Sequence, residues 1–223
     1  MPSMRFVYNL LMEKKFKIFV SWFLKELYGS LAYGYDIVAF VVSFGNWNYW
    51  TYQIKKFLNH EDKILEVGIG TGILHKNLIN KKYQIYGCDL SEKMIKISSR
   101  RLKDKGPKIL RTNNINLPFK NRSFTKIIAT FPSEYIFSED FLNEAQRLLK
   151  FGGELIVLLS VSFVKNDLIS LLYRNLYKIT GQSLSKLDSE RVIRDLFGSN
   201  LDIKLIWEPY KNVELCFVTL KSK

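Results

Sequence analysis

The sequence has few of the residues from which disulfide frameworks and metal sites are built. Its 223 residues include two cysteines and two histidines. Disulfide scaffolds and zinc sites need more of these residues at set spacings. Cys88 and Cys216 lie far apart inside apolar runs, so we expect two buried free thiols in a reducing compartment and no metal site. His60 and His75 have no evident catalytic partners, and we expect both to be structural or solvent-facing.

Long apolar runs without polar residues are also absent. Glu13 and Lys14 interrupt the early apolar stretch, so no secretory signal is expected. Residues 37–54 are uncharged and numerous enough to span a bilayer, but the second half of this run is polar. We therefore predict two helices joined at Gly45, in a cytoplasmic protein.

The composition is that of a globular protein with an excess of basic residues. Hydrophobic residues make up 47% of the chain and charged residues 25%, which excludes a disordered or fibrous protein. The formal net charge of +13 fits an anionic partner such as RNA, an acidic membrane surface or a phosphorylated substrate. A general lysine bias explains the charge equally well, because the lysines are spread along the chain.

From Lys63 onward, short β-rich runs alternate with helical patterns, which predicts an α/β fold with a parallel sheet covered by helices. Ser91 and Ser138 are predicted N-caps, and Gly152 and Gly153 are expected to end the helix that Ser138 opens. The last two strands are close enough to pair as a hairpin. The predicted strands are 63–67, 83–88, 108–111, 124–130, 154–159, 202–207 and 213–220, and the predicted helices are 72–80, 91–103, 138–150, 165–179 and one opened by Asp188.

A separate helical pattern precedes the sheet. Residues 12–27 carry apolar side chains at helical spacing, and lysines form the opposite stripe. Such a helix suits contact with an anionic membrane, or it covers the sheet or the acceptor pocket. We expect two parts, a helical cap with an entrance segment in residues 1–60 and an α/β domain in residues 61–223.

A glycine-rich turn follows the first predicted strand. Residues 64–72 read Ile-Leu-Glu-Val-Gly-Ile-Gly-Thr-Gly and run directly into a helical pattern. Such a turn brings bare backbone and a helix N-terminus against a ligand. Asp89 closes the second strand, where a carboxylate can accept hydrogen bonds from both ribose hydroxyls of a nucleoside. An ordinary tight turn or a nicotinamide dinucleotide site is the alternative, but the third glycine comes one residue early for G-x-G-x-x-G and Glu66 precedes the first.

The turn and the motifs after it resemble the class I S-adenosylmethionine-dependent methyltransferases, whose first motif has the form E/D-x-G-x-G-x-G. The resemblance covers residues 35–159 and includes residues 87–91, 117–124 and 144–153 in the order typical of the family. It implies a Rossmann-like sheet of seven strands with the last strand antiparallel. It also implies S-adenosylmethionine as the cofactor, bound by the domain of residues 61–223.

The resemblance assigns the cofactor contacts. The backbone of the three glycines would hold the methionine end, Asp89 would hold the ribose, and Leu90 would pack on the adenine. Asn113, followed by Asn114, stands where the family usually has the Asp that accepts from the adenine amino group, and an amide oxygen can still accept. The predicted contacts are Tyr35, Glu66, Gly68, Gly70, Gly72, Asp89, Leu90, Asn113 and Asn114.

The acceptor is expected above the carboxyl ends of the strands. Residues 131–135, Phe-Pro-Ser-Glu-Tyr, stand where amino-directed nucleic-acid methyltransferases carry Asn/Asp-Pro-Pro-Tyr/Phe, but the side chain that grips an exocyclic amine is absent. Glu134 or Tyr135 either orients or deprotonates the acceptor, or forms only a loop carboxylate and an aromatic wall. No catalytic residue is assigned, because methyl transfer from a sulfonium does not require a base. The predicted substrate contacts are Thr130, Phe131, Glu134 and Tyr135.

The segment before the sheet is similar to the entrance segment of the ubiquinone/menaquinone C-methyltransferases. Tyr35 and Asp36 are followed by Ser-Phe-Gly at residues 43–45. In that group the segment folds over the cofactor, which implies a cofactor contact for Tyr35. Asn-Trp-Asn-Tyr at residues 46–49 replaces the His-Arg expected there. We therefore predict a methyltransferase for a small or lipophilic acceptor, quinone-like or lipid-like, with peripheral contact to an anionic membrane.

Two other functions stay open. The positive charge would suit an RNA methyltransferase, but no RNA-binding module or aromatic stacking platform is visible, so nucleic acid is less favoured. A catalytically silent protein that senses S-adenosylmethionine or binds a partner would carry the same motifs. Nothing in the sequence indicates an oligomeric state.

Overall fold

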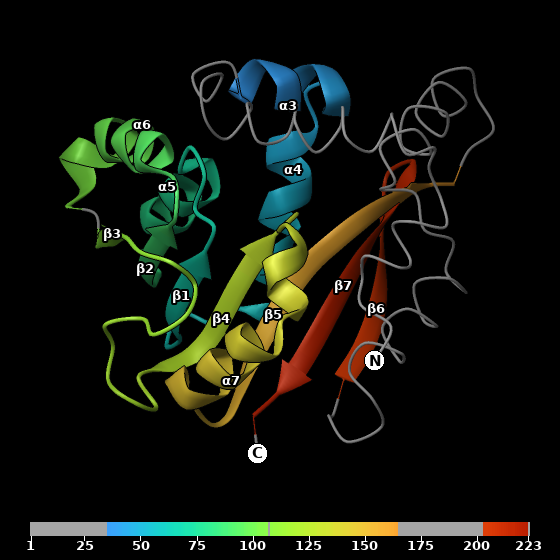
Figure 1. The fold of residues 1–223 in the computed structure, drawn as a ribbon. Helices are drawn as coiled ribbons and strands as arrows, with labels where there is room; N and C mark the ends of the chain where they lie inside the picture. The colour runs from blue at the N-terminus through green and yellow to red at the C-terminus, as the bar shows by residue number, and fades with distance from the viewer. Residues whose placement is uncertain (1–34, 107, 165–202, 223) are drawn as a thin grey trace, which may run out of the picture.

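The computed structural model describes residues 35–106, 108–164 and 203–222, which form an α/β fold around a single sheet (Figure 1). The sheet has seven strands in the order β3-β2-β1-β4-β5-β7-β6. Strands β1 to β5 are parallel, and β7 is antiparallel to both of its neighbours, β5 and β6. This arrangement confirms the predicted sheet. The strands are β1 Lys63–Val67, β2 Gln84–Asp89, β3 Ile109–Arg111, β4 Phe124–Thr130, β5 Leu149–Phe163, β6 Ile203–Tyr210 and β7 Val213–Lys221.

Helices pack on both faces of the sheet. Successive side chains of a strand point to opposite faces, and apolar side chains on both faces of this sheet form cores with the helices. In β1, Ile64 joins a core that includes Leu78 of α5, whereas the adjacent Leu65 joins a core that includes Phe141 and Leu148 of α7. All these side chains are fully buried. The helices are α3 Tyr35–Ser43, α4 Trp47–Tyr52, α5 Ile73–Asn80, α6 Glu92–Leu102 and α7 Glu139–Leu148, with 3-10 turns η2 Gln53–Phe57, η3 Lys103–Lys105 and η4 Glu134–Phe137.

Both predicted N-caps are confirmed. The Ser91 hydroxyl accepts from the backbone N–H of Met94 at 3.3 Å, and the Ser138 hydroxyl accepts from that of Phe141 at 3.2 Å. Each serine satisfies an amide at the start of its helix that has no partner within the helix. These caps define the starts of α6 at Glu92 and of α7 at Glu139.

The predicted boundary between α7 and β5 was wrong. The helix ends at Leu148 and β5 begins at Leu149, so Gly152 and Gly153 lie inside the strand. Pairing with β4 shifts register across this region, and Gly152 has a φ of +71°. A Cβ on Gly153 would lie 2.9 Å from two backbone oxygens. The glycines therefore form a bulge, which has the same local composition as a helix stop.

The predicted break at Gly45 is confirmed, since α3 ends at Ser43 and α4 begins at Trp47. Gly45 has a φ of +75°, which a residue with a side chain rarely adopts. Among the described residues, no helix is long and apolar enough to cross a membrane. The predicted helices at 12–27, at 165–179 and after Asp188 lie outside the described residues.

Candidate active site

The glycine-rich turn joins β1 to α5 at the carboxyl edge of the sheet. Gly68, Gly70 and Gly72 all have positive φ, at +75°, +55° and +79°. A Cβ on Gly72 would lie 2.9 Å from the Cβ of Ser98 in α6, whereas a Cβ on Gly70 would meet no atom within 4 Å. The turn thus has one side packed on α6 and one open side, where backbone amides can approach a ligand.

Asp89 ends β2 directly beside this turn. Its Oδ2 accepts from the backbone N–H of Gly70 at 2.8 Å, and its Oδ1 accepts from that of Ser91 at 2.8 Å. Burial raises the pKa of the carboxyl, and the hydrogen bonds from these amides oppose the rise. Each carboxylate oxygen can accept a further hydrogen bond. Asp89 therefore fits the predicted role of holding ribose hydroxyls.

Glu66 lies beneath the turn, with 2% of its surface exposed. Its Oε2 is 2.9 Å from Nδ1 of His75, which is fully buried in α5. Burial raises the pKa of the Glu66 carboxyl, and the bond to His75 counteracts part of that effect. Glu66 thus connects the start of the turn to the helix that follows it. Its predicted contact with the cofactor stays a prediction, while His75 has the structural position expected for it.

The predicted adenine contacts lie around the ends of β2 and β3. Leu90 follows Asp89 and is 63% exposed, which is unusual for a large apolar side chain beside a half-buried carboxylate. Asn113 is exposed, whereas Asn114 is half-buried and its buried Oδ1 has no hydrogen-bond partner among the described residues. Leu90 and Asn113 are therefore accessible to an adenine. The side-chain oxygen of Asn114 can accept a hydrogen bond from a ligand.

Three of the predicted substrate contacts can be placed by their side chains. Thr130 ends β4, next to β1 in the sheet, and Phe131 follows it with a φ of +47°. The ring of Phe131 lies 4.5 Å from that of Trp47 in α4, centroid to centroid. The hydroxyl of Tyr135 in η4 lies 3.1 Å from the position that a Cβ on Gly68 would take. Phe131 and Trp47 thus form an aromatic pair after the end of β4, and Tyr135 lies against the glycine turn. We refer to these three side chains as the aromatic group.

Two predicted contacts are placed by backbone alone. Tyr35 is the first residue of α3, and Glu134 is the first residue of η4. Sequence reasoning did not identify Trp47 as part of the aromatic group. The sequence feature that could have indicated Trp47 is the aromatic-rich segment at residues 46–49, which replaces the expected His-Arg.

Glu144 and Arg147 of α7 hold the loop that carries the Leu-Pro-Phe motif. Arg147 donates to the carbonyl oxygens of Leu117 at 3.0 Å and Phe119 at 2.9 Å, and the N–H of Leu117 donates to Glu144 at 2.6 Å. Hydrogen bonding from Arg147 lowers the pKa of the Glu144 carboxyl, so the pair stays ionised. The two sequence motifs form one structural unit that supports the loop after β3.

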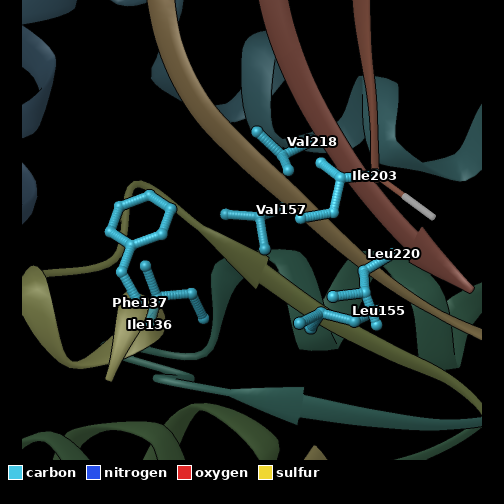
Figure 2. Close-up of a pocket in the computed structure, with 7 residues that line it drawn as sticks. All are labelled: Ile136, Phe137, Leu155, Val157, Ile203, Val218 and Leu220. Atoms are coloured by element: carbon cyan, nitrogen blue, oxygen red, sulfur yellow. The ribbon is translucent and has the colours of Figure 1, made fainter. Parts of the chain in front are cut away.

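An apolar pocket lies on the face of the sheet that α7 covers (Figure 2). It contains no titratable side chain, so it offers no group for chemistry or for binding a charged nucleoside. The residues that line it are Ile136, Phe137, Leu155, Val157, Ile203, Val218 and Leu220.

Comparison with known proteins identifies the family. The sequence profile of the ubiE/COQ5 methyltransferase family matches residues 14–189, well over half of the chain. The chain belongs to the ubiE/COQ5 methyltransferase family. The predicted class, an S-adenosylmethionine-dependent methyltransferase similar to the quinone C-methyltransferases, is therefore confirmed, and S-adenosylmethionine is the cofactor.

Curated relatives have related names. The chain is 29% identical over 145 residues to a ubiquinone/menaquinone biosynthesis C-methyltransferase of Wigglesworthia glossinidia brevipalpis, covering 60% of this chain and 58% of the relative. It is 33% identical over 138 residues to a demethylmenaquinone methyltransferase of Thermotoga maritima, covering 60% and 59%. The chain thus spans less than two thirds of the length of these relatives.

Solved structures show the same fold at low sequence identity. A phosphoethanolamine N-methyltransferase of Haemonchus contortus in complex with S-adenosyl-L-methionine has a TM-score of 0.56 and 16% identity, covering 80% of this chain and 53% of that one. A methyltransferase of Methanosarcina mazei has a TM-score of 0.51 and 20% identity, covering 76% and 96%. These similarities show the fold alone, and acceptors differ among proteins that share a fold.

Proposed function

We propose that the protein transfers a methyl group from S-adenosylmethionine to a carbon atom of a small lipophilic, quinone-like acceptor. The aromatic group, of which Tyr135 lies against the glycine turn, carries this proposal. Trp47 and Phe131 form a contacting pair of rings, and Tyr135 adds a hydroxyl that reaches Gly68. Flat rings with one polar handle suit a planar acceptor that carries hydroxyls. The names of the curated relatives support the same acceptor class.

The role proposed for the protein in catalysis is to align the acceptor with the methyl group. S-adenosylmethionine carries its methyl group on a sulfonium, and the thioether that remains after transfer is a good leaving group. Orientation of the two reactants and exclusion of water can therefore provide much of the acceleration. We propose that Trp47 and Phe131 pack against the acceptor ring and that Tyr135 holds an acceptor hydroxyl. When bound, S-adenosylmethionine would supply the methyl group to a ring carbon beside that hydroxyl. The thioether would be the leaving group, and the ring proton would pass to solvent after the transfer.

Tritiated methyl transfer tests the acceptor class. The protein is incubated with methyl-labelled S-adenosylmethionine and, separately, a reduced short-chain demethylnaphthoquinol, phospholipid vesicles and total RNA. We expect label in the quinol alone. Label in RNA alone would replace the proposal with an RNA methyltransferase. Cofactor binding without label in any acceptor would indicate a silent S-adenosylmethionine-binding protein.

A substitution in the aromatic group tests the site. Phe131→Ala removes one ring of the pair and should raise the KM for the quinol about tenfold, with a smaller change in the KM for the cofactor. Phe151→Ala is the matched control, because Phe151 is 71% exposed and contacts Arg122. Equal effects of the two substitutions on the quinol KM would contradict the placement of the acceptor.

We also propose peripheral contact with an anionic membrane, where a lipophilic acceptor would dissolve. Four large apolar residues at helical spacing are 58% to 68% exposed along α3 and just after it. Apolar side chains on one side of a helix favour the interface of a bilayer, and the net charge of +13 favours acidic headgroups. The exposed residues are Ile37, Phe40, Val41 and Phe44.

Vesicle sedimentation tests this contact. At low salt, we expect more protein to sediment with phosphatidylglycerol vesicles than with phosphatidylcholine vesicles. Val41→Ser should reduce sedimentation, whereas Phe151→Ser should not. Loss of three basic residues from the predicted N-terminal helix should weaken the association by about two orders of magnitude, at about 1 kcal/mol per residue. Equal recovery in the supernatant with both vesicle types would remove the membrane from the proposal. The three substitutions are Lys14→Gln, Lys17→Gln and Lys25→Gln.

A further inference from the structure

A closed set of hydrogen bonds connects the entrance helix α3, the glycine turn and α6. Nη2 of Arg101 lies 2.5 Å from Oδ2 of Asp36, and Nη1 of Arg101 donates to the carbonyl oxygen of Thr71 at 2.8 Å and to its hydroxyl at 2.8 Å. The Thr71 hydroxyl donates to Oδ1 of Asp36 at 2.6 Å. Each of the three residues thus contacts the other two.

Thr71 is the central residue of this set because of its place in the turn. It lies between Gly70, whose N–H donates to Asp89, and Gly72, which packs on α6. It is 5% exposed, although it belongs to a surface turn. Its carbonyl oxygen and its hydroxyl are both fixed by Arg101. A change in the position of Thr71 would therefore move the amide of Gly70 relative to Asp89.

Helix α6 holds the turn at two points on one face. Ser98 supplies the packed surface under Gly72, and Arg101, three residues later, supplies the hydrogen bonds to Thr71. Residues three apart lie side by side on a helix. The planar fork of arginine can reach a carboxylate and a backbone carbonyl at once, which the single ammonium of lysine cannot reproduce.

The ion pair lies in a partly buried environment, since the side chains of Asp36 and Arg101 are 34% and 25% exposed. A carboxylate that receives both a guanidinium and a hydroxyl is held by two charge-assisted hydrogen bonds. Asp36 is in the first turn of α3, so the bond also fixes the start of the segment that leads to Trp47. The entrance segment and the cofactor turn are therefore joined through one threonine.

We propose that Arg101 and Asp36 are positioning residues for the cofactor, which act through Thr71 and couple the entrance helix to S-adenosylmethionine binding. Neither side chain is required to touch the cofactor. The proposal requires that the protein binds S-adenosylmethionine, and it does not depend on which acceptor is methylated. Because coupling between two sites is reciprocal, cofactor binding should also stabilise α3.

A double-mutant cycle tests this coupling. Arg101→Gln, Asp36→Asn and the double variant are titrated with S-adenosylmethionine by calorimetry, with unfolding of the cofactor-free protein measured in parallel. Each single substitution should weaken binding by about tenfold, and the double variant should be no weaker than the single ones. Arg100→Gln is the matched control, because Arg100 is the exposed neighbour on the same helix and loses the same charge. Its affinity should equal that of the wild type.

Two further measurements separate positioning from general support of the fold. Thr71→Ser keeps the hydroxyl and should bind the cofactor as the wild type does, whereas Thr71→Val should match Asp36→Asn. S-adenosylmethionine should slow amide hydrogen exchange in α3 of the wild type and not of Asp36→Asn. Additive effects in the cycle, unchanged affinity in folded Asp36→Asn, or equal protection of α3 in both proteins would overturn the proposal.

Discussion

We expect the substitution Asp89→Ala to weaken binding of S-adenosylmethionine by about tenfold or more, since each hydrogen bond to a charged group contributes about 1.5 to 3 kcal/mol. The substitution removes the acceptor proposed for the ribose hydroxyls. It also frees the amides of Gly70 and Ser91, which Asp89 holds at 2.8 Å. Isothermal calorimetry with S-adenosylmethionine and S-adenosylhomocysteine measures the loss.

Matched variants separate this effect from a general effect of charge. Asp104→Ala removes an exposed carboxylate from η3 and should leave cofactor affinity unchanged. Asn113→Ala should cost less than Asp89→Ala, because an exposed neutral amide makes the weaker bond. Unchanged affinity in a folded Asp89→Ala protein would show that the ribose lies elsewhere.

We also expect Asp89 to make cofactor binding depend on pH. Burial raises the pKa of Asp89 above its ordinary value of 3.8. The ionised carboxylate accepts from hydroxyls more strongly than the protonated carboxyl does. Protonation of Asp89 should therefore weaken cofactor binding, and at a higher pH than for an ordinary aspartate. That part of the pH dependence should be missing from Asp89→Ala.

We expect Gly72→Ala to lower the free energy of unfolding by about 2 to 5 kcal/mol, from the left-handed backbone and from overpacking. Gly72 has a φ of +79°, and a Cβ there would lie 2.9 Å from the Cβ and 3.3 Å from the Cα of Ser98. The Ser98 backbone is part of α6 and cannot rotate away, so the turn or the helix must shift. Urea unfolding measures the loss.

Gly106→Ala is the control for the backbone contribution alone. Gly106 has a φ of +58°, but a Cβ there would meet no atom within 4 Å. We expect a loss of about 1 to 2 kcal/mol, the cost of a left-handed residue without a clash. Equal losses in the two variants would show that α6 yields to the new methyl group.

Local patterns in the sequence predicted much of the fold. Strands β1 and β4 have the predicted bounds, Lys63–Val67 and Phe124–Thr130, because a buried parallel strand is a short apolar run with clear ends. The start of β5 was predicted wrongly, because a glycine pair ends a helix and forms a bulge with equal ease. Only the pairing with β4 distinguishes these two outcomes.

Some features of the site were likewise predictable from local sequence patterns, and others were not. The three glycines and Asp89 lie at the ends of adjacent strands, so their spacing along the chain predicted their proximity in space. The bond between Asp36 and Arg101 joins residues 65 positions apart on two helices. Asp36 belongs to the entrance motif, but nothing in the local pattern indicates Arg101 as its partner. Such contacts depend on how the helices pack, which residue spacing does not encode.

The place of β7 in the sheet also has a consequence during protein synthesis. This strand follows the other six strands of the described sheet in the sequence, yet it pairs between β5 and β6. Until β7 has left the ribosome, β5 and β6 both lack the strand with which they pair in the described sheet. A growing chain can assemble the half of the sheet with the glycine turn before β7 is made, but β5 and β6 are joined only through β7.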